Sequence, residues 1–179
     1  DGHAYLHSAI NNNLTEIKFH GYGKQKVDKV YTDQYHQLWI TTEKPGVTRF
    51  NIANSESKYY QLTPEYLAPT IDLERPVFFE DGNKNLWIGT HGGGLVRYNR
   101  MEDKFEEFRN NANDDYSIPS NIVHCIAQDP SGQLWVGTGQ YRGGLVKIIT
   151  ENKAFRNIIP NNNQYSQVDN VVRAIMEDP

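Results

Sequence analysis

The sequence has few of the residues that crosslink a protein or hold it in a membrane. Its single cysteine, Cys125, excludes a disulfide within the chain and leaves the redox compartment open. Cys125 lies between Ile122 and Ala127, so it is most simply a small buried apolar side chain. No apolar run approaches the ~20 residues of a membrane helix, and the first residues lack the pattern of a signal peptide. We expect no membrane contact in this part of the protein.

An excess of charge of one sign is also missing. The 179 residues include 18 Lys and Arg and 22 Asp and Glu, which gives a formal net charge of −4. The basic residues are scattered singly, whereas a nucleic-acid surface needs a basic stripe that neutralises phosphates. Nucleic-acid binding is therefore disfavoured. Because hydrophobic residues make up only 37% of the chain and mean hydropathy is −0.71, the core must be thin and distributed.

What the sequence does contain is a repeat. A phrase of the form D-x-x-x-x-L-W-[IV]-x-T occurs three times at intervals of 48 residues, as DQYHQLWITT, DGNKNLWIGT and DPSGQLWVGT. Its fixed residues are Asp33, Asp81 and Asp129, and Trp39, Trp87 and Trp135. A period of this length indicates a repeated supersecondary unit. We expect the tryptophans to be structural, each filling the gap between neighbouring sheets.

Each repeat contains four short extended segments. The first is rich in β-branched and aromatic residues, which suits a strand covered on both faces; it occurs at Val27–Thr32, Val77–Glu80, Ile122–Gln128 and Val171–Glu177. The second is L-W-[IV], the third begins at Gly46, Gly94 or Gly144, and the fourth is aromatic or aliphatic. Four sequential antiparallel strands per ~45 residues predict an all-β fold of β-propeller blades. A helical solenoid does not fit the alternating β-branched residues and the glycines in every unit.

The repeat predicts about three and a half blades, a partial propeller. The predicted units are a degenerate partial blade over 1–32, three blades over 33–80, 81–128 and 129–170, and the first strand of a further blade over 171–179. The first strands of the three blades are predicted to start at residues 27, 76 and 121. A partial ring leaves apolar packing faces open. We therefore expect the remaining blades of a longer parent protein, or a second copy, to cover these faces.

The repeated phrase resembles the two-component regulator propeller repeat. Asp81–Tyr98 and Asp129–Ile148 fit its pattern closely, whereas Asp33–Phe50 departs from it at Thr41 and at Pro45-Gly46. In that family, propellers form the extracytoplasmic sensor region of hybrid two-component systems, ahead of an immunoglobulin-like domain, a membrane helix and a histidine kinase. The resemblance thus implies a periplasmic location and a kinase elsewhere in the parent protein.

The resemblance also implies a function. Sensors of this kind commonly detect oligosaccharides, so we expect a non-catalytic ligand-sensing module with an oligosaccharide partner. Two alternatives stay open: a propeller lyase or hydrolase acting on a glycan, and a protein-interaction scaffold. A catalytic site would bring His91 or His124 within hydrogen-bond reach of Asp or Glu, whereas a sensor would lack such a charged cluster.

The first candidate binding residues lie where a loop departs from the repeat. Loops that join the second and third strands share one face around the channel of a propeller, and such loops carry recognition on a rigid scaffold. His91 lies in one of them. The loop Gly139–Gly143 is longer than its equivalents and adds Gln140, Tyr141 and Arg142. An aromatic ring beside a guanidinium suits a sugar.

A second set of candidates lies five residues before the repeat aspartate. Its identity changes from unit to unit, through Asp28, Pro76, His124 and Arg173. Variable polar residues on a fixed frame suit a ligand site, although His124 and Arg173 could instead simply pair between blades. The six histidines have no metal-ligand spacing, and no G-x-S-x-G motif occurs. We therefore expect no metal, no cofactor and no catalytic residue.

Overall fold

The chain consists of antiparallel β-strands throughout the part described by its computed structural model. The described residues are 4–7, 12–17, 27–42, 46–62, 72–139, 143–149, 154–158 and 171–176. Within these ranges no helix is long and apolar enough to cross a membrane. The chain divides into two compact units, Asp1–Ala68 and Pro69–Pro179.

The first unit contains a hairpin and one four-stranded sheet. Strands β1 (Ala4–His7) and β2 (Leu14–Ile17) pair with each other. The sheet follows chain order, with β3 (Val27–Thr32), β4 (Gln37–Thr42), β5 (Val47–Asn51) and β6 (Ser57–Tyr60). Ile17 of the hairpin packs in one buried cluster with Leu38, Ile40 and Phe50 of the sheet. The degenerate first repeat therefore supplies an apolar cover for this sheet.

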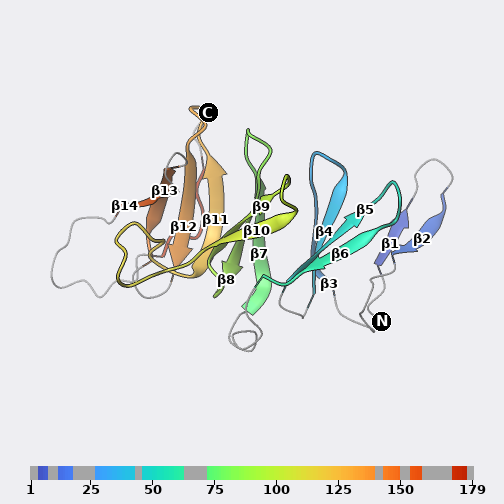
Figure 1. Ribbon diagram of the computed structural model, residues 1–179, viewed down its shortest axis with the longest axis horizontal. Coiled ribbons are helices and arrows are strands. Elements are labelled where there is room, and N and C mark those ends of the chain that lie inside the picture. Colours follow the sequence, from blue (N-terminus) through green and yellow to red (C-terminus); the bar gives the residue numbers. More distant parts are fainter. Residues whose placement is uncertain are drawn as a thin grey trace. The chain divides into compact units, whose positions relative to one another are not determined.

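The second unit contains one eight-stranded sheet that consists of two four-stranded blades (Figure 1). One is formed by β7 (Asp72–Glu80), β8 (Leu86–His91), β9 (Leu95–Asn99) and β10 (Lys104–Phe108). The other is formed by β11 (Ile122–Gln128), β12 (Leu134–Gly139), β13 (Leu145–Ile149) and β14 (Ala154–Ile158). A single residue pair, Ile122 with His91, links β11 to β8. Each half of the sheet is an antiparallel propeller blade, as the repeat predicts.

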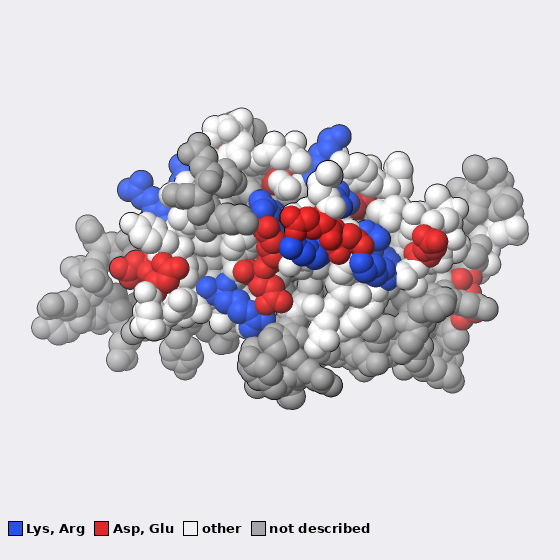
Figure 2. Space-filling view, viewed as in Figure 1, with Lys and Arg blue, Asp and Glu red and all other residues white. Residues whose placement is uncertain are grey.

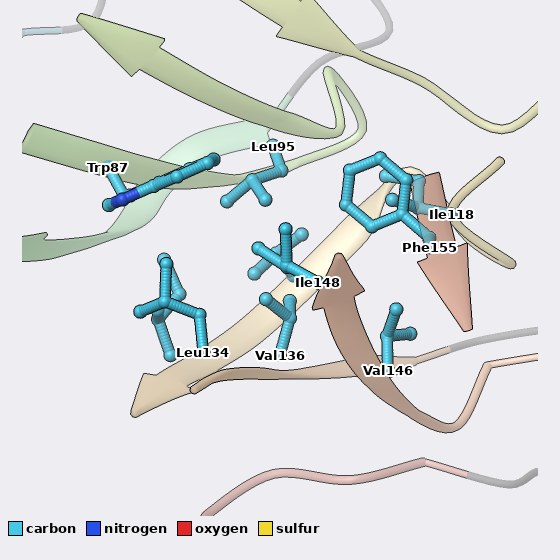
Figure 3. Packing of buried hydrophobic residues seen from close by; sticks show 10 residues of the cluster. Trp87, Leu95, Ile118, Leu134, Val136, Val146, Ile148 and Phe155 are labelled. Atoms are coloured by element: carbon cyan, nitrogen blue, oxygen red, sulfur yellow. The ribbon is translucent and has the colours of Figure 1, made fainter. Parts of the chain in front are cut away.

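The two blades of the second unit share one core. Trp87 and Leu95 of one blade face Leu134, Val136 and Ile148 of the next (Figure 3). These side chains are at most 3% exposed, and each apolar side chain buried in this way contributes about 1.5–3 kcal/mol. Neither blade could bury both of its faces alone. Stacking of successive blades therefore provides the core, as expected for a repeat architecture.

The observed first strands differ from the sequence predictions at three places. β7 begins at Asp72, whereas the predicted strand begins at Val77. The first strands are only half covered rather than buried on both faces, and Val30 of β3 is 49% exposed. The reason is that β3 lies at the edge of its sheet and pairs only with β4. Residues 171–176 carry no strand assignment. A first strand pairs with the second strand of its own blade, and no such strand follows residues 171–176 in the described chain.

Candidate functional site

The repeat aspartate and tryptophan form a hydrogen-bonded clamp in each of the three blades. The indole nitrogen donates to the carboxylate Oδ2 six residues earlier, at 2.8 Å for Trp39–Asp33, 2.8 Å for Trp87–Asp81 and 2.9 Å for Trp135–Asp129. The other carboxylate oxygen accepts backbone N–H groups two and four residues further on, at 2.9–3.0 Å. Asp and Trp are therefore conserved between the repeats for one structural reason, because a buried indole N–H needs an acceptor.

This clamp changes the acidity of one carboxyl group. Hydrogen bonds from the Ser131 hydroxyl and from the Trp135 indole stabilise the ionised form and lower the pKa of Asp129 to about 2. Both residues of the clamp were predicted to be structural from the repeat, whereas the bond between them was not predicted. The signal that could have revealed it is the constant separation of six residues between Asp and Trp.

One end of the second unit brings together residues that are far apart in the sequence. The Gly92 and Gly94 N–H groups both donate to the Asn121 carbonyl at 2.9 Å, which ties the β8–β9 turn to the start of β11. The Ser120 hydroxyl donates to the Gly139 carbonyl at the end of β12. The Val172 N–H donates to the Thr138 carbonyl at 3.1 Å, so the segment 171–176 lies beside the same end of β12.

His91 and His124 meet at this end of the unit. Their ring centres are 5.4 Å apart and the rings are tilted by 57°. The His124 imidazole lies directly against the backbone of Gly139, where a Cβ would overlap its Nε2 atom. Only glycine leaves room for the ring at this position. We call His91, His124, the Gly139 backbone beside His124, and Arg173, on the segment that lies along β12, the mouth cluster.

A β-bulge aims His124 into the mouth cluster. Val123 pairs with Thr138 and Cys125 with Gly137, so His124 is an extra residue opposite a continuous β12. Bulges redirect a side chain and are frequent beside functional sites. Asp28 occupies the equivalent extra position in β3, and the β7–β8 register is irregular around Pro76. The variable positions found in the sequence therefore coincide with irregularities in the first strands.

Two basic residues affect the acidity of His124. Partial burial lowers the pKa of His124, and the charges of His91 and Arg173 lower it further. Both of these neighbours oppose protonation of His124, which favours its neutral imidazole. Among the described residues no three His, Cys, Asp or Glu side chains are arranged to hold a metal ion.

The other predicted binding residues have separate outcomes. Gln140, Tyr141 and Arg142 lie outside the described residues. Arg173 is exposed and follows Val172, whose N–H holds the segment against β12. His91 was predicted from its place in a loop between second and third strands. His124 and Arg173 were predicted from the variable position before the repeat aspartate. Gly139 and Ser120 were not predicted, because their roles depend on the close approach of β12 to β11.

An apolar hollow lies at the other side of the third blade. It has a volume of about 270 Å³, and its apolar lining includes Trp135, Leu145, Ile175 and Met176. Trp135 and Leu145 are partly exposed, whereas the equivalent Trp87 and Leu95 are 1% and 0% exposed beneath the following blade. This face of the third blade therefore has the character of a blade-packing surface.

Charged side chains of the second unit are largely balanced locally. Figure 2 shows Lys and Arg side chains lying among Asp and Glu side chains on one face of the molecule. Ion pairs join neighbouring strands, turns and loops, between Arg97 and Glu106 at 2.6 Å, Arg100 and Glu80 at 2.9 Å, and Arg109 and Glu107 at 2.9 Å.

The strand order and the repeated clamp define this chain as a set of β-propeller blades. Residues 117–140 match the family model described as two component regulator propeller, so the resemblance seen in the sequence is confirmed for this stretch. A curated relative, Histidine kinase P4 of Formosa agariphila, is 29% identical over 70 residues. These residues cover 38% of this chain and 5% of that protein.

Solved structures of other proteins share the fold. The extracellular domain of BT4673 from B. thetaiotaomicron, described as a hybrid two component system, superposes with a TM-score of 0.62 and 19% identity over 94% of this chain. This chain spans 21% of that domain. Virginiamycin B lyase from Staphylococcus aureus, in a catalytically inactive form with quinupristin, matches with a TM-score of 0.53 and 13% identity, over 91% of this chain and 47% of the lyase. The chain thus shares its fold with these propellers.

Proposed function

We propose that this chain is a non-catalytic sensing module that binds an oligosaccharide at the mouth cluster. The observation that carries the proposal is that the His91 and His124 rings lie 5.4 Å apart, with His124 on a β-bulge and against the backbone of Gly139. These residues come from two blades, so a ligand there would contact both. A ligand that bridges two blades can bias their relative packing, which is how binding can be passed on as a signal.

The setting proposed for this module is the periplasmic side of a two-component sensor. The match to the two component regulator propeller model and the likeness to an extracellular sensor domain support this location. A histidine kinase in the parent protein would then receive the signal. The relative from Formosa agariphila, which is named a histidine kinase, supports such a partner.

A binding role fits the mouth cluster better than a catalytic role. A general acid or base of a lyase or hydrolase is usually tuned by a carboxylate within hydrogen-bond reach. The charged groups that shift the pKa of His124 are instead His91 and Arg173, both basic. This electrostatic setting supports recognition of a ligand rather than proton transfer.

The apolar hollow beside Trp135 suggests a protein partner for the same module. We propose that a further blade of this repeat, from the parent protein or from a second copy, covers this hollow. Trp87 and Leu95, the equivalents of Trp135 and Leu145, are buried by a following blade in this way. The proposed occupant thus presents the apolar pattern seen on β12 and β13.

A thermal-shift screen of the full chain against neutral and acidic oligosaccharides tests the proposed function. A ligand at ~100 times its Kd should stabilise the fold by about 2.7 kcal/mol. The expected result is a shift with at least one oligosaccharide that is lost in His91→Ala. The variant Arg156→Gln, on β14, serves as a control and should keep the shift. Turnover of an oligosaccharide by the chain would contradict the non-catalytic role.

A further inference from the structure

We propose that the apolar hollow beside Trp135 is a docking site for one extended strand of a partner protein. The strand adds to the segment 171–176 and inserts a leucine and a β-branched side chain into the hollow. This inference rests on the proposal that a further blade covers the hollow, and it names the strand that the hollow recognises. In strand addition, main-chain hydrogen bonds provide affinity, and pockets for alternate side chains provide specificity.

The segment 171–176 lies on the third blade in the way that β11 lies on the second blade. A Cβ at Gly89 of β8 would overlap the Val123 side chain of β11, and a Cβ at the equivalent Gly137 of β12 would overlap the Val172 side chain. Val123 and Val172 each lie six residues before an aspartate. The segment therefore occupies the place of a first strand, and no strand is paired with it in the described chain.

Between the two blades of the second unit, a second strand fills the space that corresponds to the hollow. β12 pairs with β11, with Val136 opposite Ile126. Leu134 and Val136 of β12 then pack in one cluster with Trp87 and Leu95 of the preceding blade (Figure 3). A leucine and a β-branched residue at alternate positions are thus the side chains that cover this face of a blade.

The hollow presents the equivalent surface of the third blade. Ile175 is the equivalent of Ile126, because each lies three residues before an aspartate. A strand that pairs with the segment 171–176 in the register of β12 would therefore direct a leucine and a β-branched side chain into the hollow. The volume of the hollow is about 270 Å³, and its apolar lining includes Trp135, Leu145, Ile175 and Met176.

The polar groups beside the hollow are hydrogen-bonded within the chain. The Gln128 amide accepts from the Gly82 N–H at 2.7 Å and donates to the Gly132 carbonyl at 2.8 Å. Asp129 accepts from the Trp135 indole at 2.9 Å. An occupant therefore finds apolar surface in the hollow and obtains its hydrogen bonds from the backbone of the segment 171–176, which suits a strand.

NMR of the full chain with methyl-labelled methionine tests the docking site. The probe is a capped peptide of sequence GQLWVGT, residues 132–138 of this chain. Met176 lines the hollow and is 92% exposed, whereas the other methionine, Met101, is 95% exposed in the β9–β10 turn. The peptide should shift the Met176 signal in a saturable way and leave Met101 unmoved. A peptide with Leu134→Asp and Val136→Asp should bind at least about 10-fold more weakly, because burial of an unpaired charge is costly.

Two N-methylated peptides separate strand pairing from docking by side chains alone. Neighbouring N–H groups of a strand point to opposite edges, so only one of two neighbours can donate to the segment 171–176. Methylation of the probe at Trp135 or at Val136 should weaken binding about 10-fold in one case and by less than about 2-fold in the other. Equal effects of the two methylations would overturn strand addition.

A pair of variants locates the docking site in the full chain. Leu145→Glu should weaken binding of the peptide at least about 10-fold, because it places a charge in the hollow. Leu14→Glu places the same charge on β2, at a residue that is 68% exposed, and should leave binding unchanged. Equal binding by both variants would also contradict the proposal.

The outcomes separate this inference from the proposal that a further blade covers the hollow. A Met176 signal that ignores the peptide, in a chain that still associates through Leu145, overturns strand recognition and leaves the covering blade in place. If the chain neither binds the peptide nor associates, both proposals fail. Sensing of an oligosaccharide at the mouth cluster is tested separately by the thermal-shift screen.

Discussion

At the scale of single residues, each blade depends on one carboxylate with several donors. In the second blade, Asp81 is 5% exposed and accepts hydrogen bonds from the Trp87 indole, two backbone N–H groups and the Asn85 amide. The bond to the indole links the hairpin turn to the blade core. A change at Asp81 should therefore affect both at once.

Replacement of Asp81 by alanine should lower the free energy of unfolding by about 2–4 kcal/mol, because it leaves buried donors without an acceptor. Urea denaturation monitored by tryptophan fluorescence measures this loss. Asp115→Ala, at an exposed position in the β10–β11 loop, is the matched control and should change stability by less than about 0.5 kcal/mol. Equal effects of the two substitutions would show that the clamp is not important for stability.

Asp129 provides a pH-dependent form of the same test. Its pKa is lowered from 3.8 to about 2 in the folded chain, so its ionised form stabilises the fold above pH 3.8. This stabilisation is lost as the pH falls from 3.8 towards 2. The difference in melting temperature between the wild type and Asp129→Asn should therefore shrink over this interval. A difference that stays constant would contradict the link to the carboxylate.

At the scale of elements, the first strand of the third blade positions the candidate site. The sequence predicted β11 with its observed bounds, since a run of β-branched and apolar residues precedes a turn-forming Asp-Pro-Ser-Gly. It could not predict the bulge at His124, because a bulge depends on the register between β11 and β12. The variable identity of this position was the only trace of it in the sequence.

Gly139→Ala tests the contact that the bulge creates. The added methyl group would overlap the His124 imidazole, so the ring has to move at a cost of about 1–3 kcal/mol. Ligand stabilisation in a thermal-shift assay should fall or disappear. At Gly144, in the same hairpin, a Cβ would lie 3.6 Å from the nearest atom, an ordinary contact. Gly144→Ala should keep ligand binding, and loss of binding in both variants would argue against a specific role for Gly139.

At the scale of the whole molecule, the repeat predicts more than any single motif. The fold class followed from the Trp spacing and the glycine-led third strands, because both are local patterns that every blade repeats. The burial of the first strands was predicted less well, as Val30 shows, because it depends on which neighbours cover each sheet. For the same reason the sequence could not predict which blade leaves its tryptophan partly exposed.

The open face beside Trp135 leads to a prediction about assembly. In a solution of the chain alone, the hollow lined by Trp135 and Leu145 should drive association with a second copy. Sedimentation equilibrium should show concentration-dependent association that Leu145→Glu abolishes, because a buried unpaired charge is costly. Arg156→Gln should associate as the wild type does. A chain that stays monomeric at all concentrations would contradict a blade-packing role for this face.

Histidine NMR during a ligand titration tests the central claim most directly, because it shows where the ligand binds. With the oligosaccharide that gives the largest thermal shift, the imidazole resonances of His91 and His124 should move together and saturate at the same ligand concentration. The resonances of His7 and His36, which belong to the first unit, should stay unchanged. A titration that binds the ligand and leaves His91 and His124 unmoved would contradict the assignment of the mouth cluster as the sensing site.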